Sequence, residues 1–155
     1  MQQEYEVVIA DTSCFILLDK IDEIQLLEKV FSSITTTQTI AEEFGRPLPD
    51  WVNVLSVQNK PYQHLLELEV DAGEASAFAL SVEYAHTLLI IDDMKARKLA
   101  DKLLLNYTGT LGVILKAKEL NIVSSIKPVL SKIQLTNFRF SQKVFEDILT
   151  IAEEK

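Results

Sequence analysis

The sequence is poor in cysteine, glycine and proline. It has one cysteine, Cys14, with four glycines and four prolines among 155 residues. A single cysteine excludes a disulfide within the chain and a zinc site made of several cysteines, and so few glycines and prolines argue against long disordered stretches. No apolar run approaches the roughly 20 residues that cross a bilayer, and the first eight residues carry Glu4 and Glu6 where a signal peptide would be basic. We therefore expect a cytoplasmic protein.

Acidic residues outnumber basic ones by 23 to 15, which gives a formal net charge of −8. This charge argues against a general nucleic-acid coat, because such proteins carry a basic face. It does not exclude a nuclease, since acids gathered at a metal site add negative charge that the bound metal locally reverses. The two histidines, His64 and His86, fall in segments predicted as a helix or the end of one, where we expect surface or packing roles.

Length and composition, with 48% hydrophobic and 25% charged residues, are those of one ordinary globular domain covering 1–155. Apolar runs over 7–10 and 87–91 predict buried strands, and weaker patterns over 33–37, 51–57 and 105–108 predict three more. Helical patterns lie between them over 14–20, 23–31, 38–44, 61–70, 73–85, 94–104 and 109–120, and a helical tail over about 126–154 divides near 137–141. This alternation predicts an α/β fold with a parallel sheet that is covered on both faces.

Acids follow the two strongest strands directly. Asp11 comes after the first, and Asp92 and Asp93 come after the strand that ends at Ile91. Ligands of such sheets bind outside the carboxyl ends of the strands, so these acids are candidate site residues. Their alternative role is to cap the helices that follow, which is common for aspartate.

Two glutamates are candidates because of their place on helices. Glu43 lies beside the apolar stripe of the 38–44 helix and can lean toward the sheet edge, whereas Glu42 falls on the opposite, solvated face. Glu74 lies in the first turn of its helix, on a face shared with Ala77, Phe78, Ser81 and Val82 that we expect to be buried. Asp71 and Glu74 also match a capping box, so Glu74 has a structural role as well as a candidate functional one.

Three or four carboxylates held together repel one another and, when buried, lose their hydration. A hard divalent cation offsets both costs, and Mg²⁺ and Mn²⁺ prefer oxygen ligands. Such an ion activates water for attack on a phosphodiester, which needs no serine–histidine or cysteine–histidine pair. The acids therefore favour a metal-dependent hydrolase.

The order of these motifs resembles the PIN domain, and most closely a prokaryotic subgroup related to the VapC toxins of toxin–antitoxin pairs. The resemblance covers nearly the whole chain and includes 138–141 in the tail. Its motifs are Val-Ile-Ala-Asp-Thr-Ser over 8–13, Glu-Glu-Phe over 42–44, Asp-Ala-Gly-Glu-Ala over 71–75, Leu-Ile-Ile-Asp-Asp-x-x-Ala-Arg over 89–97, and Gly-Thr-Leu-Gly over 109–112.

The resemblance implies a three-layer α/β/α fold with a parallel sheet of about five strands. It implies an endoribonuclease that leaves 5′-phosphates, uses Mg²⁺ or Mn²⁺, forms a homodimer and is blocked by an antitoxin protein. By the same match the catalytic and metal-binding acids are Asp11, Glu43, Glu74 and Asp92, with Asp93 as a further metal candidate. The weaker candidates, for contact with RNA or support of the metal ligands, are Thr12, Ser13, Thr110, Lys95 and Arg97.

The chain departs from the family pattern at two positions. Thr37 stands where a proline is frequent, and Ile90 stands where a threonine often precedes the fourth acid. Neither change removes a carboxylate, but the loss of a threonine hydroxyl near Asp92 is expected to weaken the orientation of that acid.

Other functions stay open at this point. The fold could be a catalytically inactive PIN module that binds RNA or a protein. A phosphatase of the haloacid-dehalogenase type also has an early strand-end aspartate and a late Asp-Asp pair, but it needs Asp-x-Asp where this chain has Asp11-Thr12-Ser13. A response-regulator receiver usually has an acidic pair after its first strand, and Asp11 stands alone.

Overall fold

The computed structural model of the chain describes residues 5–138 and 140–154. The expectations that concern residues 1–4 and Arg139 therefore lie outside the described residues.

Five parallel strands form one sheet in the order β3-β2-β1-β4-β5, which confirms the predicted sheet. Ala10 of β1 pairs with Ile90 of β4, so the acids that follow both strands emerge at the same edge. From β1 the chain continues outward to β2 and β3, and it then returns to place β4 and β5 on the other side of β1. This reversal of strand order between β1 and β4 opens a crevice at the carboxyl ends of the two strands. The strands are β1 (Val7–Ala10), β2 (Ile34–Thr37), β3 (Val52–Leu55), β4 (Thr87–Ile90) and β5 (Asn106–Thr108).

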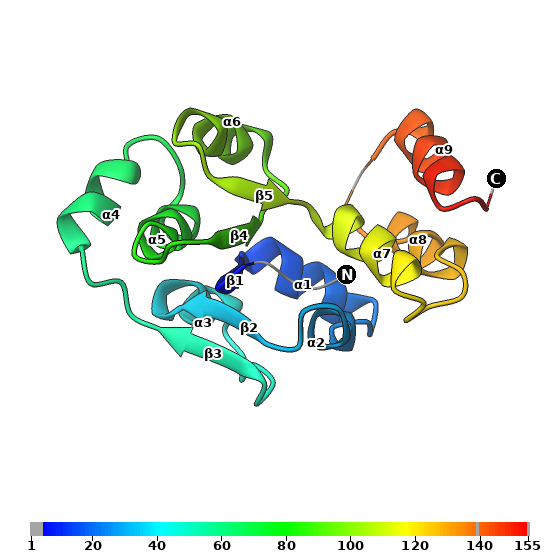
Figure 1. Cartoon of the computed structure of the whole chain (residues 1–155), viewed down its shortest axis with the longest axis horizontal. Coiled ribbons are helices and arrows are strands. Elements are labelled where there is room, and N and C mark those ends of the chain that lie inside the picture. Colours follow the sequence, from blue (N-terminus) through cyan, green and yellow to red (C-terminus); the bar gives the residue numbers. More distant parts are fainter. Residues whose placement is uncertain (1–4, 139, 155) are drawn as a thin grey trace.

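Helices cover both faces of the sheet, as the three-layer α/β/α prediction requires. In Figure 1, α4 and α5 lie on one side of the sheet and α1, α2 and α7 on the other. None of the helices described is both long and apolar enough to span a membrane. The helices within the described residues are α1 (Thr12–Lys20), α2 (Gln25–Phe31), α3 (Gln38–Phe44), α4 (Lys60–Leu66), α5 (Ala72–Ser81), α6 (Met94–Lys102), α7 (Thr110–Glu119), α8 (Lys127–Gln134) and α9 (Gln142–Ile151).

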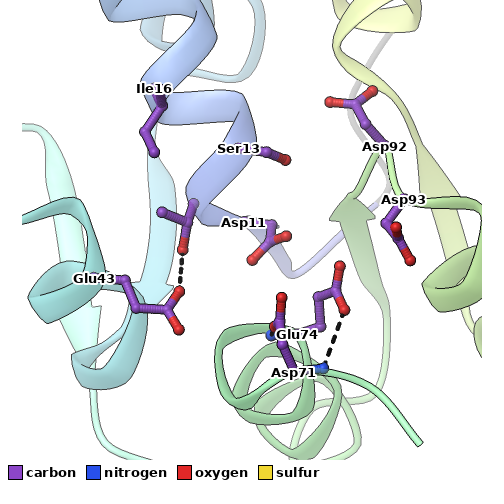
Figure 2. Close-up of a pocket in the computed structure, with 9 residues that line it drawn as sticks. Asp11, Ser13, Ile16, Glu43, Asp71, Glu74, Asp92 and Asp93 are labelled. Carbon is purple, nitrogen blue, oxygen red and sulfur yellow. Dashed lines mark hydrogen bonds between the residues drawn. The ribbon is translucent and has the colours of Figure 1, made fainter. Parts of the chain in front are cut away.

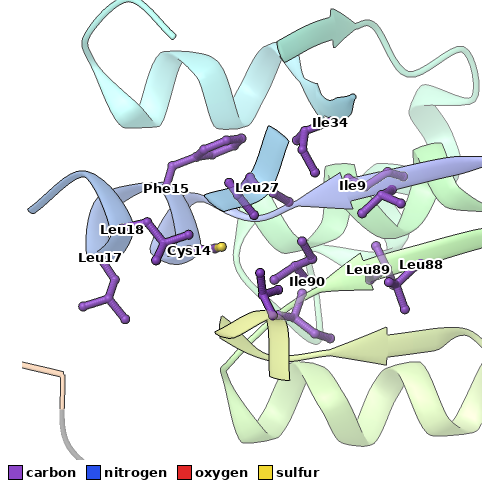
Figure 3. Close-up of a cluster of buried hydrophobic side chains, with 14 of the residues drawn as sticks. Ile9, Cys14, Phe15, Leu17, Leu18, Leu27, Ile34, Leu88, Leu89 and Ile90 are labelled. Carbon is purple, nitrogen blue, oxygen red and sulfur yellow. The ribbon is translucent and has the colours of Figure 1, made fainter. Parts of the chain in front are cut away.

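The core lies around the two central strands. Ile9, Leu89 and Ile90 are fully buried, and Figure 3 shows them packed with side chains from α1 and α2, including Phe15 and Leu27. Strands covered on both faces read as continuous apolar runs, which is why β1 and β4 were the strongest strand predictions. This packing fixes the strand ends from which the acids project.

Two predicted helices are too long. The helix expected over 73–85 ends at Ser81, because the backbone N–H of Ala85 donates to the Glu6 carboxylate and the His86 carbonyl accepts from the Glu6 N–H. These hydrogen bonds hold residues 85–86 beside the start of β1. The helix expected over 61–70 ends at Leu66, and the strand expected over 51–57 covers only the four residues of β3.

The tail forms two helices, as predicted, and it packs on the core. Ile148 and Leu149 of α9 are buried, and the three tail phenylalanines, Phe138, Phe140 and Phe145, are partly buried against the core. At its end the Glu154 carboxylate accepts hydrogen bonds from Lys118 Nζ (2.6 Å) of α7, Ser125 Oγ (2.6 Å), and the backbone N–H groups of Ile126 (2.8 Å) and Lys127 (3.3 Å).

Candidate active site

A pocket of about 560 Å³ opens where β1 and β4 end, and carboxylates dominate its wall. Six of the nine residues that line it are acidic, and no lysine, arginine or histidine is among them. Figure 2 shows the acids arriving from α1, α3, α5 and the β4–α6 connection. The pocket brings together all four main acids predicted from the sequence. The lining residues are Asp11, Thr12, Ser13, Ile16, Glu43, Asp71, Glu74, Asp92 and Asp93.

Asp11 occupies the N-cap position of α1, but its side chain makes no capping hydrogen bond. Its carboxyl group points into the pocket instead (Figure 2), and only 6% of the residue is exposed. Burial, with the added repulsion of Asp71, Glu43 and Asp92, raises the pKa of Asp11 to about 7. The cap role therefore does not account for this residue.

Glu43 reaches the pocket from α3, whereas Glu42 does not line it, as the helix geometry predicts. The Thr12 hydroxyl donates a hydrogen bond of 2.6 Å to Glu43 Oε1. The same oxygen lies against α5, because a Cβ added to Gly73 would come within 2.4 Å of it. Thr37, which replaces the frequent proline, caps α3 by accepting a hydrogen bond from the Ile40 N–H. The position of Glu43 thus depends on the Thr12 hydroxyl and on the absence of a Cβ at Gly73.

Glu74 forms the predicted capping box and also lines the acidic pocket. Asp71 Oδ1 accepts from the Glu74 N–H (2.8 Å) and Glu74 Oε1 accepts from the Asp71 N–H (3.4 Å), which is the capping box of α5. Glu74 is also buried, and burial together with the charges of Asp71 and Asp11 raises its pKa to about 7. Asp71 was predicted only as a cap, yet it lines the pocket as well; its spacing from Glu74 was the available signal.

Asp92 and Asp93 are neighbours with different roles. Asp93 Oδ2 accepts from the Ala96 N–H (3.0 Å) and caps α6, so the cap interpretation holds for this residue, which also lines the pocket. Asp92 is held by Thr110, which donates its backbone N–H to Oδ1 (2.9 Å) and its hydroxyl to Oδ2 (2.6 Å). The N-cap of α7 is Gly109, and Thr110 is fully buried. Thr110 therefore supports an acid, which is one of the two roles expected for it, and its contact with RNA stays a prediction.

The remaining weaker candidates divide between the pocket and the surface around it. Ser13 lines the pocket and is exposed. Lys95 is exposed on α6 and does not line this pocket. Arg97 of α6 is partly buried, although helix geometry alone would place it on the outer face, and its Nε donates to the Ile91 carbonyl (3.0 Å). Ile16, which the sequence did not single out, lines the pocket with 44% of its surface exposed.

The donor set fits a hard divalent cation in its chemistry. Every charged group in the pocket is a carboxylate. Burial, with added repulsion, raises the pKa of Asp11 and Glu74, and a cation would offset both effects. Among the described residues, however, no three histidine, cysteine, aspartate or glutamate side chains stand close enough to hold one ion together. Binding Mg²⁺ or Mn²⁺ would therefore require retained waters, as is usual for Mg²⁺, or an inward movement of side chains.

Comparison with known proteins gives one result for nearly the whole chain. A family model described as a PIN domain matches residues 7–154. No curated protein and no solved structure matches the chain.

Proposed function

Because the chain belongs to the PIN-domain family, we propose that it is a Mg²⁺- or Mn²⁺-dependent endoribonuclease whose active site is the acidic pocket. PIN domains are generally nucleases, and this chain has a nuclease-type fold. The observation that carries the proposal is the convergence of six carboxylates from four separate segments on one pocket. Helix capping accounts for Asp71, Glu74 and Asp93, and Asp92 accepts the first N–H of α7. Asp11, by contrast, makes no capping hydrogen bond, and Glu43 accepts the Thr12 hydroxyl.

The residues proposed to hold the cation are Asp11, Glu43, Glu74 and Asp92, with Asp93 contributing through the oxygen that does not cap α6. When bound, the ion would supply Lewis acidity and an activated water for attack on an RNA phosphodiester. The chain's own part is to orient the ligands. Thr12 fixes the Glu43 carboxylate, and Thr110 fixes both oxygens of Asp92, which limits the reorganisation that binding requires.

The raised pKa values of Asp11 and Glu74 also bear on the proposal. At a pKa of about 7, each carboxyl group carries a proton for part of the time at neutral pH. Oxygen ligands must be deprotonated to bind a cation, so metal binding would release protons from these two groups. We therefore propose that metal affinity falls as the pH drops below about 7, and that cleavage at subsaturating metal falls with it.

RNA cleavage tests the proposal directly. Wild-type protein is incubated with a mixed pool of single-stranded RNA with Mn²⁺ or with chelator, and the product ends are analysed. We expect metal-dependent cleavage with 5′-phosphate ends, a loss of 100-fold or more, on the order of one catalytic group's contribution, in Asp11→Asn, and normal activity in Glu42→Gln. Equal cleavage by wild type and Asp11→Asn would place the active site elsewhere.

The same assay separates the alternatives. An inactive module would bind RNA or protein but would not cleave RNA with any metal. The wild type would then show the same absence of cleavage as Asp11→Asn. The phosphatase and receiver alternatives are not retained, because the family match assigns the chain to another fold family.

Five expectations stay predictions. They are a single domain over 1–155, the toxin role, the antitoxin partner, the homodimer and the cytoplasmic location.

A further inference from the structure

An acidic pocket faces an electrostatic problem if its substrate is a polyanion. The pocket lining has six acids and no cationic side chain, and the chain as a whole carries a charge of −8. Phosphates on either side of the scissile bond need a positive group nearby. A second hollow, of about 440 Å³, shares Asp92 with the acidic pocket and contains such a group, Arg97. Its lining also includes Tyr107, Gly109 and Phe138.

Arg97 is fixed in this second hollow by three contacts. Its Nε donates to the Ile91 carbonyl at the end of β4 (3.0 Å). Its guanidinium carbon lies 5.3 Å from the centre of the Tyr107 ring on β5, a cation–π geometry. It also lies against Gly109, where an added Cβ would be 2.1 Å from Nη2. The neighbouring α6, β5 and the start of α7 are visible together in Figure 1.

The fixed guanidinium keeps its terminal nitrogens free. Among the described residues, neither Nη atom of Arg97 makes a hydrogen bond or an ion pair. Asp92 lies beside the same glycine, since the added Cβ would be 2.8 Å from its Oδ1, but its two oxygens are bonded to Thr110. Gly109 therefore keeps a proposed metal ligand and an unpaired cation side by side.

We propose that Arg97 binds a backbone phosphate of the RNA strand where the strand leaves the acidic pocket on the Asp92 side. The ligand class rests on the proposed function, whereas the preorganised cation does not. A planar guanidinium matches phosphate oxygens with two parallel hydrogen bonds. Because the guanidinium is already held by the Ile91 carbonyl and the Tyr107 ring, little side-chain entropy is lost on binding. The exposed lysines of α6 have no such support.

The test measures RNA binding separately from cleavage. A short single-stranded RNA of mixed sequence is titrated with wild type, Arg97→Gln, Arg97→Lys and Lys102→Gln at several salt concentrations, with Ca²⁺ in place of Mn²⁺. Lys102 is an exposed lysine of the same helix and controls for net charge. Loss of one phosphate contact should reduce the slope of log K against log salt by about 0.7 and weaken binding roughly ten-fold in Arg97→Gln alone. Arg97→Lys should restore most of the slope and only part of the affinity.

A purely structural Arg97 predicts a different result. If Arg97 is only structural, Arg97→Gln would lower the thermal midpoint without changing the salt slope of RNA binding, or would change that slope as little as Lys102→Gln does. Either result overturns the inference. Absence of RNA binding by the wild type overturns it as well. Arg97-dependent binding by a wild type that cleaves no RNA would support the phosphate site and contradict the proposed function. Cleavage that is unaffected in both KM and kcat by Arg97→Gln would contradict the phosphate site alone.

Discussion

Thr110 holds Asp92 by both carboxylate oxygens, with a backbone N–H on Oδ1 and a hydroxyl on Oδ2. Asp92 lies in the connection after β4, whereas Thr110 is the first residue of α7. Ile90 stands where a threonine often precedes this acid in the family, but Asp92 keeps a hydroxyl donor in Thr110. Orientation of Asp92 is therefore shared between two segments of the fold.

Thr110→Val should damage the metal site more than the fold. The valine keeps the shape and the N–H but leaves Asp92 Oδ2 without its hydrogen bond, so we expect metal affinity to fall about 10- to 100-fold. The free energy of unfolding should fall by about 1–2 kcal/mol. Calorimetric Mn²⁺ titration and urea unfolding measure the two effects. Thr110→Ser keeps the hydroxyl and should retain most of the affinity; equal affinities in Thr110→Val and wild type would refute the role of the hydroxyl.

Gly73→Ala should separate stability from activity. The added Cβ would occupy the place of Glu43 Oε1, and the exposed end of that side chain can move away. Alanine is the better helix residue, so the free energy of unfolding should stay the same or rise by up to about 1 kcal/mol. Cleavage and Mn²⁺ affinity should fall about ten-fold. A fully active variant would show that Glu43 does not depend on this close approach, whereas a clearly destabilised variant would show that its side chain cannot move away.

The metal-free protein should lose stability as the pH rises from about 4 to about 7. Folding raises the pKa of Asp11 from 3.8 and of Glu74 from 4.5, each to about 7. The native state therefore binds more protons than the unfolded state in this window, and the free energy of unfolding falls with increasing pH. Urea unfolding in chelator at about pH 5 and about pH 8 measures the loss.

The control for this pH dependence is Asp11→Asn, which should flatten the curve in the same window. Mn²⁺ should stabilise the wild type more at pH 8 than at pH 5, because the ligands are then deprotonated. A wild type whose stability rises between pH 5 and pH 8 in chelator would contradict the burial and repulsion that we assign to these acids.

Glu154 should anchor the helical tail. Burial opposes its ionisation, but hydrogen bonds from Lys118, Ser125 and two backbone N–H groups outweigh burial and lower its pKa to about 2. Its contribution is complete above about pH 4.5 and is lost as the pH falls toward 2. Glu154→Gln should reduce the free energy of unfolding by about 1–3 kcal/mol at neutral pH, and the exposed neighbour Glu153→Gln by less than about 0.5 kcal/mol. Equal losses of unfolding free energy in the two variants would show that the hydrogen bonds of Glu154 do not stabilise the tail.

The sheet could be predicted from the sequence because its central strands are buried on both faces. Apolar runs over 7–10 and 87–91 contain no polar alternation, and the acids directly after them mark the strand ends. The end of α5 could not be predicted, because the residues after Ser81 still favour a helix. The helix ends there through hydrogen bonds between 85–86 and Glu6, which join residues far apart in the sequence.

The candidate site was predictable where one residue's place on an element decides its direction. Asp11, Asp92, Glu43 and Glu74 could be placed by strand ends and helix faces, and all line one pocket. Arg97 could not be placed in this way, because helix geometry alone puts it on the outer face. Its actual position depends on the space above Gly109 and on the Tyr107 ring, which only the packed structure brings beside α6.

Direct binding of Mn²⁺ tests the central claim without knowledge of the RNA target. Calorimetric titration at about pH 8 compares wild type, Asp11→Asn and Glu42→Gln, with Glu42 as a neighbouring acid outside the pocket. We expect binding at millimolar Mn²⁺ or below in wild type and Glu42→Gln, with a loss of at least about ten-fold in Asp11→Asn. No binding by the wild type at millimolar Mn²⁺, or equal binding by wild type and Asp11→Asn, would contradict the account.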